Sequence, residues 1–217
     1  MKFISSETGQ SLQLIVMDEV RPLRGGPFLP DAAAAITRRY RFVSVPAQTD
    51  PAQPIKFQTG AIELDGITIP ITSLEIYNDG IIINSLTTDD ADAVMDDFIS
   101  WRKQEFQFRE PTTKLPRQYQ SRIVVGLDRS LNKFISHFQE MKTTLAKFFQ
   151  TDEDTLNLLR LSIGPHPAGA LPYRTTWLIE PRTVQPIVPN RYFSAAPLST
   201  TAHIELLSAL EAVADLS

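Results

Sequence analysis

The sequence predicts an α+β fold, in which a mostly antiparallel sheet packs against three main amphipathic helices. Two observations lead to this prediction. Alternating apolar runs joined by Asp-Gly pairs occupy residues 55–86, a pattern typical of a meander of β-hairpins. Apolar residues then recur at helical spacing in three segments that begin near Thr88, Asp128 and Thr201. The meander and the strands expected between residues 122 and 180 would together form the sheet.

The chain before the meander predicts two strands with a short helix between them. Residues 12–20 are expected to form the opening strand, which a loop rich in proline and glycine follows. A short helix is expected over residues 32–40, because Asp31 offers an acceptor just before its start and two arginines lie in its last turn. Residues 41–45 would return as a strand, and the prolines between residues 46 and 54 predict an exposed connection.

The meander contains two strong turn signals, Asp65-Gly66 and Asp79-Gly80, because both residue types tolerate a positive φ angle. Residues 81–83 are three isoleucines, which would be apolar on both faces of a strand and therefore predict a central one. The strands of the meander are expected over residues 61–64, 67–71, 73–77 and 81–86.

A long helix is expected to follow the meander, from Thr88 to about Phe106. Hydroxyl and carboxylate groups at residues 87–90 supply the acceptors and the negative charge that favour a helix start. Apolar residues, Trp101 among them, then recur at helical spacing and predict one buried stripe.

Residues 109–121 contain two prolines and no hydrophobic periodicity, so this segment predicts a linker. The linker would join two sub-halves, residues 1–110 and residues 121–217. We expect the sub-halves to form one compact unit over residues 1–217.

The second sub-half predicts the order strand, helix, two or three strands, helix. A buried strand is expected over residues 122–127, and a long helix would run from Asp128 or Ser130 to Phe149. Further strands are expected at 155–163 and 174–180, with an edge strand at 191–195 and a last helix at 201–216. The large side chains expected in the core are Trp101, Phe134, Phe138, Phe148 and Leu207.

The composition excludes several classes of chemistry. The chain of 217 residues has no cysteine, which excludes disulfides, thiolate nucleophiles, iron–sulfur clusters and cysteine-ligated zinc. A net charge of −4 disfavours nucleic acid as a partner. No apolar segment approaches the roughly 20 residues that span a bilayer, so we expect a soluble, cytoplasmic protein that does not contact a membrane.

No motif identifies a reaction, a metal site or a cofactor, and we expect no cofactor. The densest acidic group lacks the glycine and the final carboxylate of a calcium loop, so it is interpreted as a helix cap with a solvated face. The three histidines do not have zinc-binding spacing, and the chain has neither a serine elbow nor a phosphate-binding loop. The acidic group consists of Asp89, Asp90, Asp92, Asp96 and Asp97.

Two segments combine arginine with aromatic residues, the combination that anchors protein interfaces. One is the strip of residues 102–122, and the other is the proline-rich region 163–191, where prolines would lower the entropic cost of binding. The candidate partner-binding residues are His166, Tyr173, Arg174, Arg182, Arg191 and Tyr192.

Two functional hypotheses follow from these features. The first is a non-enzymatic protein-binding or assembly module that recognises a protein partner or a second copy of itself. The alternative is an enzyme of unrecognised type, acting on an anionic small molecule through the 163–191 loops, with His166, Tyr173, Arg174 and Arg182 as its site. An exposed edge strand at 191–195 would also invite pairing with another chain.

Overall fold

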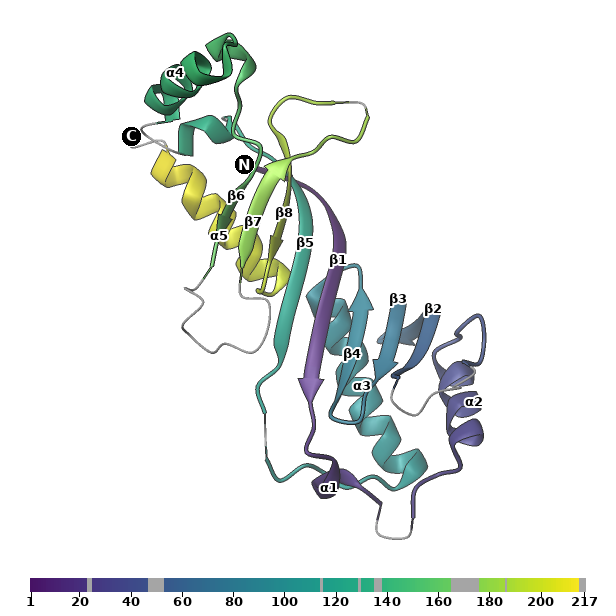
Figure 1. Ribbon diagram of the computed structural model, residues 1–217. Coiled ribbons are helices and arrows are strands. Elements are labelled where there is room, and N and C mark those ends of the chain that lie inside the picture. Colours follow the sequence, from purple (N-terminus) through teal and green to yellow (C-terminus); the bar gives the residue numbers. More distant parts are fainter. Residues whose placement is uncertain are drawn as a thin grey trace. The chain divides into compact units, whose positions relative to one another are not determined.

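The fold is α+β, as the sequence predicts. The structure is a computed structural model that describes residues 1–22, 25–46, 53–113, 115–128, 130–134, 138–164, 176–185 and 187–214 (Figure 1). Its strands are hydrogen-bonded in the order β2 (Ile55–Leu64), β3 (Ile67–Ile76), β4 (Gly80–Ser85), β1 (Lys2–Leu14), β5 (Gln118–Gly126), β8 (Arg191–Ala196), β7 (Trp177–Pro181) and β6 (Leu161–Ile163). The strand pairs with a described register are antiparallel. None of the helices in the described ranges has the length and apolar character needed to cross a bilayer.

The chain divides into two compact units. One consists of Glu7–Ser121 and is called here the 7–121 unit. The other consists of Arg122–Ser217 together with Met1–Ser6 and is called the 122–217 unit. Strands β1 (Lys2–Leu14) and β5 (Gln118–Gly126) each contribute residues to both units.

The 7–121 unit contains most of the predicted meander. The hairpin turn at Asp65-Gly66 is confirmed, because both residues have the positive φ angles, 51° and 78°, that a tight hairpin turn needs. The predicted strands at 67–71 and 73–77 form a single strand. Pro70 is tolerated there because β3 pairs with β4 only from Ser73 onward. Besides β1, the elements of the 7–121 unit are α1 (Met17–Val20), α2 (Leu29–Arg39), β2 (Ile55–Leu64), β3 (Ile67–Ile76), β4 (Gly80–Ser85) and α3 (Thr88–Phe106).

Helix α3 is confirmed over the predicted residues. The Thr87 hydroxyl oxygen accepts the Asp90 backbone N–H at 3.1 Å, and the hydroxyl donates to the Asp90 carboxylate at 2.8 Å. This reciprocal cap satisfies a backbone N–H that would otherwise lack a partner. The apolar stripe of α3 packs with α2 against β3 and β4, and β4 is a central strand, as predicted.

Two predictions for the start of the chain are wrong. The opening strand is β1, which ends at Leu14, while residues 17–20 of the predicted strand form helix α1. Glycine is required within β1, because a Cβ atom at Gly9 would lie 2.0 Å from the carbonyl carbon of Thr87. Residues 41–45 form no strand, since Phe42 instead turns into the core and covers Gly60.

The 122–217 unit has a second hydrophobic core, in which Leu207 is buried as predicted. This core also contains Ile123, Val125, Leu131 and Ile179. The elements are β5, η1 (Leu131–Phe134), α4 (Phe138–Phe149), η2 (Glu153–Thr155), β6 (Leu161–Ile163), β7 (Trp177–Pro181), β8 (Arg191–Ala196) and α5 (Thr200–Ala214).

Several predictions for this unit are also wrong. The segment predicted as one helix from Asp128 or Ser130 to Phe149 begins with the 3₁₀ helix η1, and α4 starts at Phe138. Of the strand predicted over 155–163, only Leu161–Ile163 is a strand.

Strand β8 lies between β5 and β7, so it is not an edge strand, and its backbone is not available to pair with another chain. Phe148 is 80% exposed, because α4 turns Lys142 and Ala146 inward instead. The side chains of Phe134 and Phe138 lie outside the described residues, and Trp101 is partly buried at the edge of the other core.

The two units repeat one topology, although the sequence shows no convincing repeat. The order strand, helix, three strands, helix is β1-α2-β2-β3-β4-α3 in one unit and β5-α4-β6-β7-β8-α5 in the other. The neighbouring strands also correspond, since β2-β3-β4-β1 matches β6-β7-β8-β5.

Candidate functional site

The partner-binding residues predicted from the sequence do not form one described site. His166, Tyr173 and Arg174 lie outside the described residues. The Arg182 backbone N–H donates to the Arg191 carbonyl at 2.9 Å, which places both at the β7–β8 pairing. Tyr192 is buried, and its hydroxyl oxygen accepts the Leu131 N–H at 2.8 Å, so its side chain belongs to the core.

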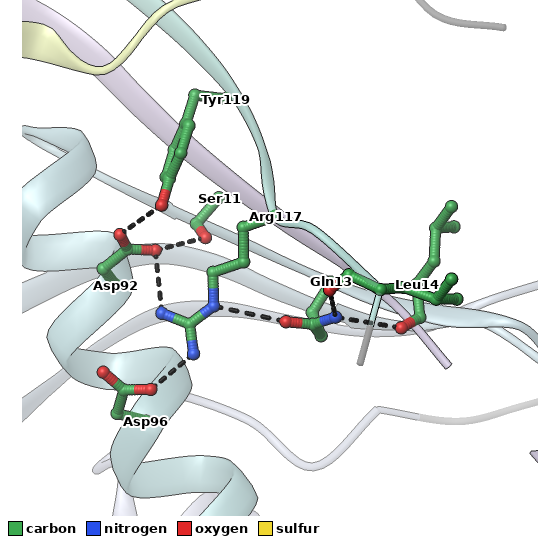
Figure 2. Close-up of polar contacts among 8 residues, drawn as sticks. Ser11, Gln13, Leu14, Asp92, Asp96, Arg117 and Tyr119 are labelled. Atoms are coloured by element: carbon green, nitrogen blue, oxygen red, sulfur yellow. Dashed lines mark hydrogen bonds and ion pairs between the residues drawn. The ribbon is translucent and has the colours of Figure 1, made fainter. Parts of the chain in front are cut away.

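The acidic face of α3 forms a polar network (Figure 2). Asp92 accepts hydrogen bonds from the Ser11 hydroxyl at 2.6 Å and the Tyr119 hydroxyl at 2.8 Å. Its carboxylate also pairs with Arg117, with a distance of 3.1 Å between Nη1 and Oδ1. Asp92 is therefore part of the packing between α3, β1 and β5, and its interpretation as a solvated residue is wrong.

This network satisfies its own charges. Burial would lower the pKa of Arg117, but the ion pairs with Asp96 and Asp92 outweigh burial and raise it. Burial and the hydrogen bond to Asp92 raise the pKa of Tyr119, so its hydroxyl stays a donor. A saturated network of this kind fixes the position of a helix rather than offering a free group for chemistry.

An apolar cavity of about 230 Å³ lies in the 7–121 unit. Helix α2 and the C-terminal part of α3 provide part of the lining, and β2, β3 and β4 provide another part. Phe57, Ile81 and Phe98 are buried lining residues, whereas Pro27 and Leu29 are exposed lining residues.

The alanine run at the start of α2 explains why this space stays open. Ala32 and Ala33 are buried and line the cavity, and Ile36 lines it one turn later. A larger side chain at either alanine would project into the cavity, since helical residues three and four apart share a face.

Arg102 is the unusual residue of the cavity lining. It is only 6% exposed, and its guanidinium carbon lies 5.3 Å from the centre of the Phe108 ring. Among the described residues it has neither a hydrogen-bond partner nor an ion-pair partner, in contrast to Arg39 and Arg117, which pair with aspartates. Burial lowers the pKa of Arg102 to about 10, so the side chain still carries its charge at neutral pH.

Sequence reasoning placed Arg102 in the surface strip 102–122 and missed its burial. A signal was present, because Val94, Phe98, Arg102 and Phe106 follow one another at intervals of four residues. An arginine within the apolar stripe of a helix points toward the core rather than toward solvent. Metal binding has no comparable candidate, since no group of three or more acidic or histidine side chains in the described part could hold an ion.

Comparison with known proteins identifies no family. A scan against protein-family models gives no match to the chain, and a search of curated proteins gives none.

Proposed function

We propose that this protein is a non-enzymatic binding module that holds a small apolar ligand in the cavity of the 7–121 unit. The observation that carries the proposal is the cavity itself, with a volume of about 230 Å³ and a lining almost entirely of apolar side chains. An apolar cavity of about 150 Å³ accepts a benzene molecule. By simple scaling, this cavity would accept a hydrocarbon body of roughly nine carbon atoms.

The energetics support occupation. An apolar ligand seated in this cavity would leave water, and each CH₂ group that it buries contributes roughly 0.8 kcal/mol. The ligand would also gain dispersion contacts with the apolar lining.

The composition of the lining favours binding over catalysis. Among the described lining residues, only Tyr77 and Arg102 have polar side chains. The Tyr77 hydroxyl already donates to Glu75 at 2.9 Å. A general acid or base needs a titratable group close to the reacting atoms. Neither Tyr77 nor Arg102 is well suited to that role.

Calorimetric titration with n-octanol tests the proposal. The wild-type protein should bind octanol, and Ala33→Leu should weaken binding at least about tenfold, because the longer side chain fills the cavity. Ala34→Leu is the matched control, since Ala34 lies on the same helix but does not line the cavity. Failure of the wild type to bind, or equal binding by Ala33→Leu, would refute the proposal.

A second candidate function is self-association through α4. Met141, Leu145, Phe148 and Phe149 form one exposed apolar face of this helix, and Phe149 is 64% exposed. In an antiparallel pair centred on Leu145, Met141 of one copy would meet the phenylalanines of the other, a favourable sulfur–aromatic combination. The face is thus complementary to itself, which favours a second copy of the chain as its partner.

Sedimentation analysis over a range of concentrations tests self-association. The wild type should form a dimer as concentration rises, and Phe148→Ser should remain monomeric. Val43→Ser is the control, because Val43 is equally exposed in the 7–121 unit. A wild-type protein that stays monomeric would exclude this candidate.

A further inference from the structure

We propose that the ligand of this cavity is an amphipathic monoanion, a carboxylic acid whose carboxylate pairs with Arg102 and whose hydrocarbon body fills the apolar cavity. This inference rests on the proposed function, because it specifies the class of ligand for the same site.

The first argument is the unsatisfied hydrogen-bonding capacity of Arg102. A guanidinium group carries five N–H donors, and a carboxylate can accept two of them in parallel. In the described residues, the charge of Arg102 meets only the face of Phe108. The guanidinium nitrogens of Arg102 keep some access to solvent, so a carboxylate can reach them and form charge-assisted hydrogen bonds, which are stronger than those to a neutral group.

The second argument is the charge balance of the cavity. None of the described lining residues is an aspartate or a glutamate, so the lining presents a single positive charge. A carboxylate brings one negative charge and matches it. A phosphate monoester would bring nearly two, and the excess would be held in an apolar site at a cost.

The third argument is the arrangement of apolar and charged groups. Arg102 lines the same cavity as Phe57, Ile81 and Phe98, so one molecule can reach both the charge and the apolar side chains. By the same scaling as above, the volume of about 230 Å³ has room for the whole hydrocarbon chain of an acid such as octanoate. A free amino acid or a short dicarboxylate would leave the apolar part of the cavity unfilled.

The test compares octanoate, octanol and octyl phosphate by calorimetric titration at neutral pH. The wild type should bind octanoate at least about tenfold more tightly than octanol, because only octanoate is charged. Octyl phosphate should bind more weakly than octanoate. Tighter binding of octyl phosphate would overturn the assignment of a monoanion.

Two variants separate the charge from the cavity. Arg102→Met keeps the length of the side chain but removes its charge, so it should lose at least about tenfold of octanoate affinity and a clearly smaller factor of octanol affinity. Lys103→Met is the control, since it removes the neighbouring, exposed charge and should leave both affinities unchanged. Arg102→Lys keeps the charge without the planar donors and should retain an intermediate octanoate affinity, which provides a test if Arg102→Met does not fold.

The outcomes distinguish the two proposals. If neither octanoate nor octanol binds the wild type, the proposed function fails, and this inference fails with it. If both bind equally and the Arg102 variants change neither affinity, the cavity binds apolar molecules, but the carboxylate assignment is wrong.

Discussion

The two units share one topology but differ in what fills their interiors. Corresponding positions can be compared, because β4 matches β8 and α3 matches α5 in the shared topology. The fourth residue is Ile83 in β4 but Ser194 in β8, and it is Ala91 in α3 but His203 in α5. All four residues are buried. In the 122–217 unit, Ser194 Oγ lies 2.9 Å from His203 Nε2 and accepts the Trp177 indole N–H at 3.1 Å. A polar contact thus occupies positions that are apolar in the 7–121 unit.

The helix starts of the two units are alike. Thr87 precedes α3 and Ser199 precedes α5, and each side chain accepts a backbone N–H of the first helical turn, from Asp90 and Ala202 respectively. The comparison indicates that helix caps and strand order are enough to maintain the topology. The residues between sheet and helix can then differ, leaving a cavity in one unit and a hydrogen-bonded histidine in the other.

The largest expected effect is from placing the serine of one unit into the other. Ile83→Ser should lower the free energy of unfolding by roughly 4 kcal/mol, because it removes buried apolar atoms and leaves a hydroxyl without the histidine partner it has in β8. Urea unfolding of a Trp177→Phe background, in which Trp101 reports on the 7–121 unit, measures this change. Ile82→Ser, at a less buried neighbour, should cost less, and an equal cost would contradict the comparison.

The next effect is a pH dependence specific to the 122–217 unit. Burial lowers the pKa of His203 from 6.5 to about 4, so between these values the unfolded chain binds more protons than the folded one. Stability from the neutral ring is fully present above pH 6.5 and decreases as the pH falls to about 4, by on the order of 3 kcal/mol.

A variant without His203 isolates this dependence from the titration of carboxylates. In a Trp101→Phe background, where Trp177 is the reporter, His203→Asn should be less stable at neutral pH, and its stability should change less between pH 6.5 and 4. An unchanged slope in His203→Asn would show that His203 does not control the acid sensitivity of this unit.

A smaller, matched pair of effects tests the shared helix caps. Thr87→Ala and Ser199→Ala should each lower the free energy of unfolding by about 1 kcal/mol, because each removes one side-chain acceptor from a helix start. Unfolding of each unit, followed by its own tryptophan, provides the measurement. A loss confined to one variant would mean that the two helix starts do not depend equally on their caps.

The smallest expected effect is that of a substitution in α4, and a substitution in the corresponding helix α2 serves as its comparison. Phe148→Ser in α4 should change stability by less than about 0.5 kcal/mol, because this side chain is largely exposed. Ile36→Ser in α2 should cost about 3 kcal/mol, because Ile36 is buried in the core. A large loss from Phe148→Ser would show that α4 is packed as closely as α2.

Much of the local structure could be predicted from the sequence. The Asp65-Gly66 turn and the Thr87 cap depend on residues close together in the chain, so short motifs specify them. Strand β1 was misplaced because polar side chains occupy much of it, and Ser11, for example, has its hydrogen-bond partner on α3 far along the sequence. The central place of β8 depends on its pairing with β5 and β7, which a local pattern does not contain.

The candidate site was harder to predict. A cavity results from how α2, α3 and the sheet meet, and no single segment encodes the space between them. The place of Arg102 in the apolar stripe was a usable signal, but only the three-dimensional structure shows that Arg102 has no ion-pair partner among the described residues. The alanines of α2 predict a helix equally well whether or not they leave room for a ligand.

The division of β1 between the two units has a consequence for synthesis of the chain. Residues Met1–Ser6 are synthesised before Glu7–Ser121, yet they belong to the unit whose other residues, Arg122–Ser217, are synthesised after it. The 122–217 unit therefore cannot form all of its contacts until Arg122–Ser217 has been synthesised, whereas Glu7–Ser121 can begin to fold before that. The protein should thus fold in an order that its linear sequence of helices and strands does not suggest.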